Sequence, residues 1–339
     1  MSVLASSCAD TRGAQEPTAA LERHAWHGVR SPLVLVTMDG ARWQDVFEPH
    51  GRDPLPNMRR LAQTRGAFVG APGRGRIDAS GPEYISLPGY NEILSGRPPR
   101  ACQTNDCPRA TAHTLLDEAW ASGAEVAAFA SWEKLDRAIT SSPGKFLVSC
   151  GRDGDPTIDP YPGSGDFRPD AITGYLAVSH LWRSQPDVLF VGLGEPDEYA
   201  HRGDREGYES ALRLDDEIVG QIFHVLDQMG ERGAQTTVVV TADHGRADDF
   251  NGHGGWAPES ARVWLFASGP TFDARGRVAS LEPRHLADIA PTLRIVLGLD
   301  ADRSAVAGRP MTELFGIPRP PTQLSDARHI EEGARVTHP

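Results

Sequence analysis

The stretch from residue 238 to residue 255, VVVTADHGRADDFNGHGG, constrains this chain more than any other. It overlaps a run of β-branched residues, 236–241, which predicts a fully buried strand. Asp243 and His244 follow that strand directly, and His253 comes nine residues later among glycines. Carboxylate and imidazole groups at the end of a buried strand suit a divalent metal ion better than a hydrophobic core. The stretch therefore predicts a strand that delivers metal ligands.

Apolar runs alternate with amphipathic segments along most of the chain. The runs that predict strands are residues 33–37, 125–130, 187–193, 236–241 and 261–267, and the segments that predict helices are residues 54–66, 111–123, 172–184, 212–226 and 284–299. This alternation favours an α/β fold with a mainly parallel central sheet and helices on both faces. A chain of 339 residues is long enough for two average domains or one large α/β domain.

Composition divides the chain into three parts. Residues 1–30 are expected to be a poorly ordered leader, residues 31–318 a single domain, and residues 319–339 a loose tail. Within the domain, residues 131–170 are rich in Gly, Pro and Asp and show few regular signals. We therefore expect an elaborated loop or small cap there, which would contribute to substrate specificity.

The net charge of the chain is -12, and its isoelectric point is about 5.5. This balance argues against a nucleic-acid-binding surface and fits a protein that uses carboxylates to bind cations, although plain acidic solubility fits it equally well. No apolar run reaches the length of a transmembrane helix, so no membrane span is expected. The sequence does not indicate the oligomeric state.

The N-terminal residues and the cysteines bear on localisation. The N-terminus lacks the basic and apolar regions of a signal peptide, although LASSC, which ends at Cys8, resembles a lipoprotein cleavage site shifted by one position. We expect a periplasmic or secreted protein, with lipid attached at Cys8, if translation starts further upstream, and a cytoplasmic protein otherwise. In an oxidising compartment Cys102 and Cys107 could close a small disulfide, and Cys150 is the fourth cysteine.

Two candidate site residues lie early in the chain. Asp39 ends the strand predicted at residues 33–37, where open α/β sheets build their sites, although the pair Asp39-Gly40 is also typical of a turn. Ser86 opens a predicted helix just before Pro88. Its hydroxyl could be a nucleophile, with the developing charge of a phosphate facing the helix N-terminus, or an ordinary helix cap.

Two further candidates follow the strand predicted at residues 187–193. Asp197 and His201 are four residues apart, so one helical turn places both on one face. Such a pair can bind one metal ion, although it can also be an ordinary surface pair. All the candidate residues follow predicted strands or open the next helix, and independent surface residues need not share that position. This shared placement is the strongest indication of a single site.

Taken together, these stretches resemble the alkaline phosphatase superfamily, and within it the type I phosphodiesterase/nucleotide pyrophosphatase branch. The resemblance covers residues 33–315. It rests on the order and spacing of six motifs, which are VTMDGARWQDVF, ISLPGYNEILSG, EPDEYAH, TADHG followed by His253, HLADIAPTLRIVLGL and AGRPMTELF. It implies an alkaline phosphatase-like three-layer sandwich. It also implies a metal-dependent hydrolase, a phosphatase or phosphodiesterase, that acts on a small-molecule phosphate ester.

The resemblance also implies a set of metal ligands. Two divalent metal ions, most often Zn²⁺ in this family, would be bound, the first by Asp39, Ser86, Asp243 and His244, and the second by Asp197, His201 and His253. Ser86 would attack phosphorus and form a phosphoserine intermediate. The second metal ion would stabilise the leaving oxygen and then activate the water that releases phosphate.

The nucleophile segment departs from the branch. Nucleotide pyrophosphatase relatives usually have threonine as the nucleophile, in a TFPN motif, where this chain has SLPG. Gly89 thus replaces a phosphate-contacting asparagine, and Asn91 is the nearest substitute. The SLPG sequence is closer to bacterial phosphoglyceromutase-like members. The choice between monoesters and diesters therefore stays open.

Neighbouring branches of the superfamily fit the sequence less well. A cofactor-independent phosphoglycerate mutase needs a large inserted domain, and the interval between Ser86 and Asp197 is too short to hold it. A sulfatase needs an arginine in the pattern C/S-x-P-x-R, where this chain has Tyr90. Two alternatives stay open. One is phosphoryl transfer to an acceptor other than water, and the other is a homologue that binds metal and phosphoryl ligands without turning them over.

Overall fold

The computed structural model describes residues 31–49, 51–151 and 167–315. Its main sheet has eight strands, which are, in spatial order, β10 (Gly276–Arg277), β2 (Gly66–Val69), β9 (Leu265–Ser268), β7 (Thr237–Thr241), β1 (Leu33–Met38), β6 (Val188–Leu193), β4 (Val126–Ala130) and β5 (Leu147–Cys150). The five strands from β7 to β5 are parallel, whereas β9 is antiparallel to β7 and β2. The sheet is therefore mainly parallel, as the sequence predicts.

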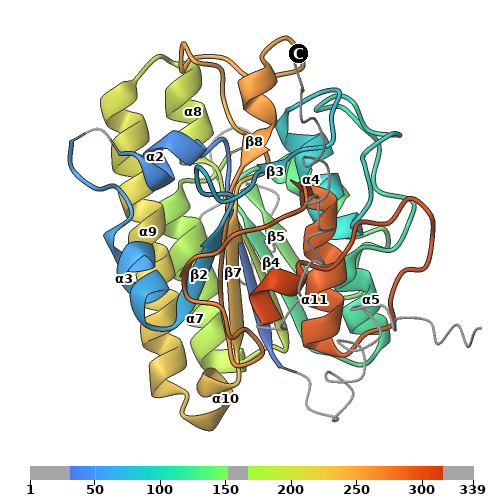
Figure 1. Ribbon diagram of the computed structural model, residues 1–339. Coiled ribbons are helices and arrows are strands. Elements are labelled where there is room, and N and C mark those ends of the chain that lie inside the picture. Colours follow the sequence, from blue (N-terminus) through green and yellow to red (C-terminus); the bar gives the residue numbers. More distant parts are fainter. Residues whose placement is uncertain (1–30, 50, 152–166, 316–339) are drawn as a thin grey trace, which may run out of the picture.

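Helices cover both faces of this sheet (Figure 1). One layer contains α2 (Trp43–Phe47), α3 (Pro56–Thr64), α7 (Asp170–Ser184), α8 (Glu195–His201), α9 (Arg205–Gln228) and α10 (Glu231–Ala234). The other contains α4 (Ser86–Ser95), α5 (Leu115–Ala121), α6 (Asp136–Ile139) and α11 (Ile289–Leu297). Short 3₁₀ turns are η1 (Glu133–Leu135), η3 (Pro258–Ala261), η4 (Leu286–Asp288) and η5 (Thr312–Phe315). The predicted α/β three-layer sandwich is confirmed.

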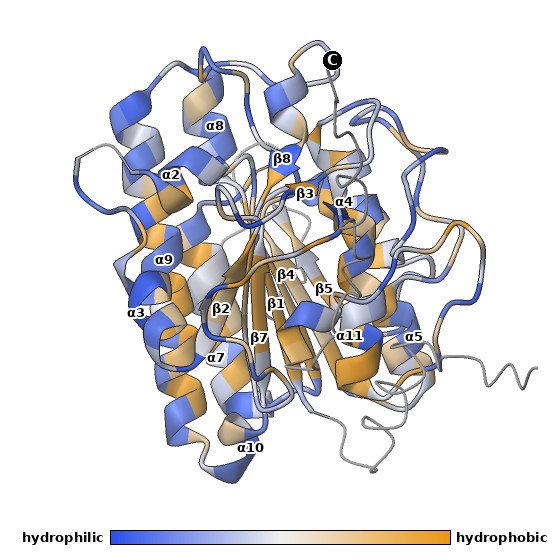
Figure 2. Ribbon diagram, viewed as in Figure 1, coloured by the Kyte–Doolittle hydropathy of each residue, from blue (hydrophilic) through white to orange (hydrophobic). Residues whose placement is uncertain are grey.

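The strands are buried because they read as continuous apolar runs. In β7, Val238, Val239 and Val240 are each at most 1% exposed. Parallel strands with helices on both faces need this composition, because neither face of the sheet meets water. The helices are amphipathic, and α9 buries Leu212 and Ile222 on its apolar side. Figure 2 shows apolar strands between helices that carry both hydrophilic and hydrophobic residues. The alternation read from the sequence thus reflects burial in the middle layer.

A second, small sheet has the order β11-β3-β8, with the bounds β11 (Arg284–His285), β3 (Ile77–Asp78) and β8 (Arg262–Val263). The strand predicted at residues 261–267 is wrong as a single element, because β8 and β9 share that segment. Trp264 separates them, with its ring fully buried and its Nε1 donating to the Ala41 carbonyl oxygen at 2.9 Å. The chain changes sheets at this side chain.

The helix predicted at residues 284–299 starts later than expected. Its first two residues form β11, and η4 and α11 follow. The Asp288 carboxylate accepts from the backbone N–H of His285 at 3.2 Å, so it closes the first turn in the manner of a helix cap. Pro291 lies in the first turn of α11, where its missing N–H breaks no helical hydrogen bond.

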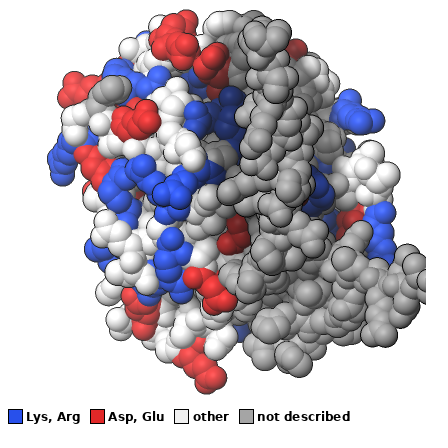
Figure 3. Space-filling model, in the orientation of Figure 1, with Lys and Arg blue, Asp and Glu red and all other residues white. Residues whose placement is uncertain are grey.

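Part of the segment expected to be loop or cap, residues 131–170, is regular. It contains η1, α6 and β5, and β5 forms one edge of the main sheet. The middle of that segment lies outside the described residues, as do the expected leader at 1–30, the expected tail at 319–339, and Cys8. None of the helices in the described ranges combines the length and apolar content that a bilayer span requires. Basic and acidic side chains are interspersed on the described part of the face in Figure 3.

Candidate metal centre

Three neighbouring parallel strands bring the carboxylates of the site together. β7, β1 and β6 lie side by side, and their registers pair Thr37 with Thr241 and Met38 with Leu193. The strands therefore end level with one another. Asp39 follows β1, and the loops after β6 and β7 carry the other candidates, as expected where ligands gather at the carboxyl ends of a sheet.

The Asp39-Gly40 pair forms a turn and also belongs to the candidate metal site. Gly40 has a φ of 61°, in the left-handed region that favours glycine. A Cβ at this position would lie 2.5 Å from Asp197 Oδ1, so a side chain is also excluded by space. The Gly40 N–H donates to Asp243 Oδ1 at 3.1 Å. The Asp-Gly pair is thus a tight turn that lets three carboxylates from three strands approach one another.

Ser86 is the first residue of α4, and Ile85 occupies the cap position without a side-chain cap hydrogen bond. The Ser86 hydroxyl is not a helix cap, so that reading of the sequence is wrong. Its Oγ lies 3.4 Å from Asp39 Oδ1 and 3.3 Å from His244 Nε2. The hydroxyl is therefore directed at the carboxylate and imidazole that follow β1 and β7.

His244 is oriented by its own backbone. Its Nδ1 lies 2.8 Å from the Gly245 carbonyl oxygen, which can only accept, so Nδ1 carries the ring proton. The Nε2 lone pair then points toward Asp39 Oδ1 and Asp243 Oδ2, each at 3.4 Å. Burial lowers the pKa of His244 well below its usual value, which favours the neutral ring. A neutral imidazole with an oriented free nitrogen is the form that binds metal ions.

Asp197, His201 and His253 form the adjoining group. His201 Nε2 lies 3.0 Å from Asp197 Oδ2 and 2.9 Å from His253 Nε2, and His253 Nε2 is 3.6 Å from Asp197 Oδ1. His253 donates through Nδ1 to the Tyr84 carbonyl oxygen at 2.9 Å, so its Nε2 is also free of a proton. The His253 ring stacks on His244 with centroids 3.9 Å apart. This stack joins the two groups of candidate residues.

The charge balance of the cluster fits divalent cations. Burial and the charges of Asp243 and Asp197 raise the pKa of Asp39 well above its usual value, and burial together with Asp197 does the same for Asp243. Asp243 Oδ2 is buried without a hydrogen-bond partner among the described residues. Asp197, His201 and His253 present ligand atoms within 4.8 Å of one another, as do Asp39, Asp197 and His244. Bound cations would relieve these repulsions, and the residue types suit zinc.

Arg246 is a functional candidate that the sequence reading missed. Its side chain is 1% exposed, and its guanidinium donates through Nη1 to Asp197 Oδ1. Burial alone would raise the pKa of Asp197. The hydrogen bond from His201 and the nearby His253, His244 and Arg246 side chains together outweigh burial and lower that pKa. Arg246 fixes one oxygen of Asp197 by its hydrogen bond.

Phe250 holds Arg246 in this position. It has a φ of 74°, unusual for a residue with a side chain, and its carbonyl oxygen accepts from Arg246 Nε at 2.6 Å. Its ring packs edge-on against Tyr208 at 4.9 Å, and the guanidinium groups of Arg42 and Arg205 lie over the same ring. Phe250 therefore departs from the backbone conformation usual for a residue with a side chain. Because no sequence pattern predicts this departure, none indicated the position of Arg246.

The residues around Ser86 show why the SLPG segment lacks the asparagine of the TFPN motif. A Cβ at Gly89 would lie 2.3 Å from the Asp243 carbonyl oxygen, so an asparagine cannot fit at this position. Asn91 does not replace it, because its Nδ2 donates to the Leu87 carbonyl oxygen at 2.8 Å. Instead, Asn105 from a distant loop accepts from the Leu87 N–H at 2.9 Å. In the sequence, Asn105 is marked only by its position between Cys102 and Cys107.

Behind α8 lies a second cluster of buried carboxyl groups. Asp170 accepts from the backbone N–H groups of Gly194 and Glu195, at 2.9 Å and 2.6 Å, and so fixes the start of the helix that carries Asp197. Burial and the charge of Glu195 raise the pKa of Asp170 to about 7. Asp215 is fully buried beside it, with both oxygens unpartnered in the described part of the chain. Burial and the charge of Asp170 therefore favour the protonated form of Asp215.

This arrangement predicts a pH-dependent stability. Burial, then the charges of Asp170 and Glu195, raise the pKa of Asp215 well above its usual value, and Asp216 adds to the effect. The unfolded chain releases this proton near pH ~4, whereas the folded chain keeps it to higher pH. The free energy of unfolding therefore falls as pH rises from ~4 toward the folded pKa.

The variant Asp215→Asn removes this titration. We expect the variant to gain about 1–2 kcal/mol over the wild type at pH ~8 and much less at pH ~5, measured by urea unfolding. Exposed Asp248→Asn, on the loop after β7, is the control and should leave the pH dependence unchanged. A gain that is equal at both pH values would contradict a proton held by Asp215 in the folded chain.

Comparisons with known proteins agree with this geometry. The sequence model of the Metalloenzyme superfamily matches residues 173–301. A 2,3-bisphosphoglycerate-independent phosphoglycerate mutase of Natronomonas pharaonis is 32% identical over 129 residues, which are 37% of this chain and 24% of that protein. The chain spans about a quarter of the length of the first such relatives that it matches. These matches concern the metalloenzyme part of the relatives and not their whole activity.

Solved structures share the fold. The phosphonate monoester hydrolase of Agrobacterium radiobacter superposes with a TM-score of 0.63 at 17% identity, over 86% of this chain and 78% of that chain. A 2-O GAG sulfatase superposes with a TM-score of 0.58 at 14% identity, over 85% and 74% of the two chains. The mainly parallel sheet, the metalloenzyme match and these neighbours converge on one conclusion. They support the assignment of this chain to the alkaline phosphatase superfamily.

Proposed function

We propose that this protein is a metal-dependent hydrolase of small-molecule phosphate esters, with Ser86 as its nucleophile and two zinc ions as its cofactors. One observation carries the proposal. The Ser86 hydroxyl lies within 3.4 Å of both Asp39 Oδ1 and His244 Nε2, at the level ends of three adjacent parallel strands. A hydroxyl beside buried carboxylates that lack a counter-charge is where a metal-dependent nucleophile would be placed.

The ligand atoms divide between two ions. Asp39, Ser86, Asp243 and His244 would hold the first ion, and Asp197, His201 and His253 the second. The unpartnered Asp243 Oδ2 and the proton-free Nε2 atoms of His244 and His253 support this division. When bound, such ions stabilise charge on phosphoryl oxygens and lower the pKa of water to about 7.

The residues of the chain then have distinct tasks. Ser86 Oγ forms a bond to phosphorus, its proton passes to solvent, and the bond from phosphorus to the leaving oxygen breaks. Water then cleaves the phosphoserine and restores the hydroxyl. The start of α4 presents its positive end to the phosphoryl group, because Ser86 is the first residue of that helix. Arg246 holds one oxygen of Asp197 by a hydrogen bond.

Phosphoryl transfer is the second candidate, because the curated relatives that match are phosphoglycerate mutases. In that reaction an alcohol and not water would accept the phosphoryl group from Ser86. Adding a small diol during turnover separates the two. Release of inorganic phosphate alone supports hydrolysis, whereas a new phosphate ester as the main product supports transfer.

The proposal is tested with p-nitrophenyl phosphate and its diester. We expect the purified protein to hydrolyse at least one of them, a chelator to lower turnover by at least about 100-fold, and zinc to restore it. The ratio of the two rates would also settle whether monoesters or diesters are preferred. Undiminished turnover after the metal content has fallen below one-tenth of an ion per chain would contradict a metal-dependent mechanism.

A further inference from the structure

A disulfide closes a small loop beside the nucleophile helix. Cys102 and Cys107 are bonded, with Cα atoms 5.3 Å apart and both side chains buried. The sequence left this pairing open, and the structure places it in the loop between α4 and α5. Cys150 is free and buried in β5. The loop of residues 102–107 is therefore the part of the described chain whose shape depends on an oxidised bond.

This loop contacts the start of α4 through Asn105. The Asn105 side-chain oxygen accepts from the Leu87 N–H at 2.9 Å. Leu87 follows Ser86 directly, and its N–H is one of the helix N-terminal donors that no helical carbonyl can satisfy. The disulfide itself touches the same helix, because Asn91 Nδ2 lies 3.5 Å from Cys102 Sγ. The loop thus supplies to the nucleophile helix the cap that Ile85 does not.

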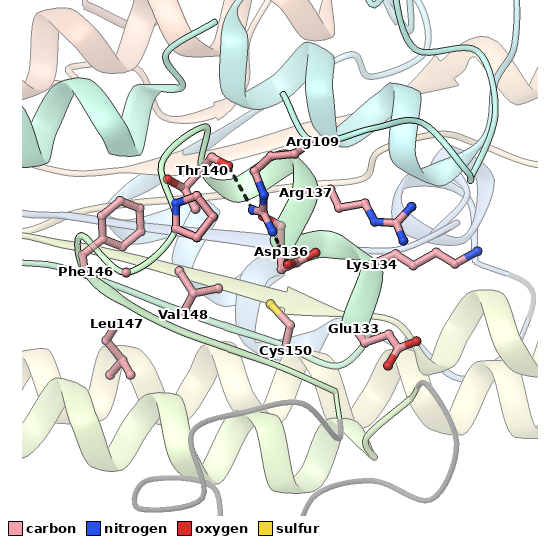
Figure 4. Close-up of a pocket in the computed structure, with 12 residues that line it drawn as sticks. Arg109, Glu133, Lys134, Asp136, Arg137, Thr140, Phe146, Leu147, Val148 and Cys150 are labelled. Atoms are coloured by element: carbon pink, nitrogen blue, oxygen red, sulfur yellow. Dashed lines mark hydrogen bonds and ion pairs between the residues drawn. The ribbon is translucent and has the colours of Figure 1, made fainter. Parts of the chain in front are cut away.

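The outer side of the loop rests on η1 and α6. Asp106 accepts from Lys134 Nζ at 2.9 Å, and the Cys107 carbonyl oxygen accepts from Arg137 at 3.3 Å. Past the loop, Arg109 lies between Asp136 and the Thr140 carbonyl oxygen. Figure 4 shows these two Arg109 contacts beside a cavity of about 450 Å³. These contacts fix the exit of the loop rather than Asn105.

The disulfide is the covalent restraint on Asn105, beside hydrogen bonds from Gln103 to the Pro99 carbonyl oxygen and from the Cys107 N–H to the Thr104 carbonyl oxygen. Residues 102–107 contain no helix or strand, and the Asp106–Lys134 pair is on the surface, with 85% of the Asp106 side chain exposed. A surface ion pair contributes little to holding a loop. A covalent link between residues five apart restricts every residue between them, and Asn105 is one of these.

We propose that the Cys102–Cys107 disulfide is a positioning device for the nucleophile, so that turnover depends on its oxidation state. The inference rests on the proposed phosphate ester hydrolysis. Reduction by a phosphine breaks the Sγ–Sγ bond, converts the phosphine and one water molecule to the phosphine oxide, and leaves two thiols. Asn105 then leaves the Leu87 N–H, and the helix start that carries Ser86 loses its cap.

The experiment compares the zinc-loaded wild type before and after phosphine reduction with the variants Cys102→Ser/Cys107→Ser and Asn105→Ala. We expect each change to lower kcat by about tenfold with KM within about twofold and zinc content unchanged, since it displaces the nucleophile without removing a ligand. Combining all three substitutions should cost no more than Asn105→Ala alone, because both act through one contact. A phosphine is used because a dithiol would also bind zinc.

Two controls test whether the Cys102–Cys107 disulfide is the target of the reductant. Reductant should have no effect on the double cysteine variant, which excludes Cys150 and Cys8 as its targets, and Cys150→Ser should keep the response of the wild type. An unchanged kcat in the reduced protein, even with a lowered melting temperature, would show that the disulfide only stabilises the fold and would overturn the inference. An oxidised wild type that hydrolyses neither ester would instead overturn the proposed function.

Discussion

Replacing Ser86 with alanine is expected to lower kcat for p-nitrophenyl phosphate or its diester by at least about 10³-fold, which corresponds to about 4 kcal/mol in the activation free energy. The reason is chemical, because the variant lacks the Oγ that lies between Asp39 and His244. Alanine leaves α4 intact, since the Ser86 side chain makes no cap hydrogen bond. The loss should therefore appear in turnover and not in folding.

Two measurements make this result specific. Ser95→Ala, at the other end of the same helix, is the matched control and should keep wild-type turnover, because its Oγ contacts only Arg97. The metal content of Ser86→Ala should stay close to that of the wild type, because three protein ligands of the first ion remain. If Ser86→Ala turns over at the wild-type rate, the assignment of the nucleophile is wrong.

Replacing His253 with alanine is expected to deplete one metal site more than the other. The variant loses the Nε2 that meets Asp197 and His201 and keeps every ligand proposed for the first ion. Affinity at the second site should fall by more than the ~10- to 100-fold that loss of an outer-sphere partner costs. Turnover should fall by at least about 100-fold, because the second proposed ion, which would stabilise charge on the leaving oxygen, would no longer be held.

Metal analysis of the dialysed variant measures this directly, with about one zinc per chain expected where the wild type holds about two. His224→Ala is the matched control, because His224 is exposed on α9 away from the cluster. Equal loss of both ions in His253→Ala would show that the two sites are inseparable. The stack of His253 on His244, with centroids 3.9 Å apart, is the contact that would then couple them.

The long buried strands were predictable because their chemistry is local. β1, β6 and β7 read as unbroken apolar runs, and Asp39 and Asp243 follow them within two residues in the sequence. The shorter strands were not predictable, since β2 and β5 have four residues each and β3 has two. Their positions are set by pairing with distant partners and not by any periodic pattern.

The parts of the site that the sequence did not reveal depend on the backbone of loops. Arg246 lies three residues after Asp243, yet its direction is decided by the left-handed turn at Phe250, whose ring is held by Arg42, just before α2, and by Tyr208 in α9. Asn105 reaches Leu87 from a loop that a disulfide closes, 18 residues away in the sequence. Neither contact could be predicted from a sequence motif, because each depends on residues far away in the sequence or on an unusual backbone conformation.

The central claim, two ions and one serine, is tested most directly by returning zinc to the chelated protein in small steps while turnover and bound metal are measured together. The account predicts little turnover with about one zinc per chain and full turnover with about two, because the two proposed ions would act on different oxygens of the reaction. Full turnover at one zinc per chain, or in the metal-free protein, would contradict it.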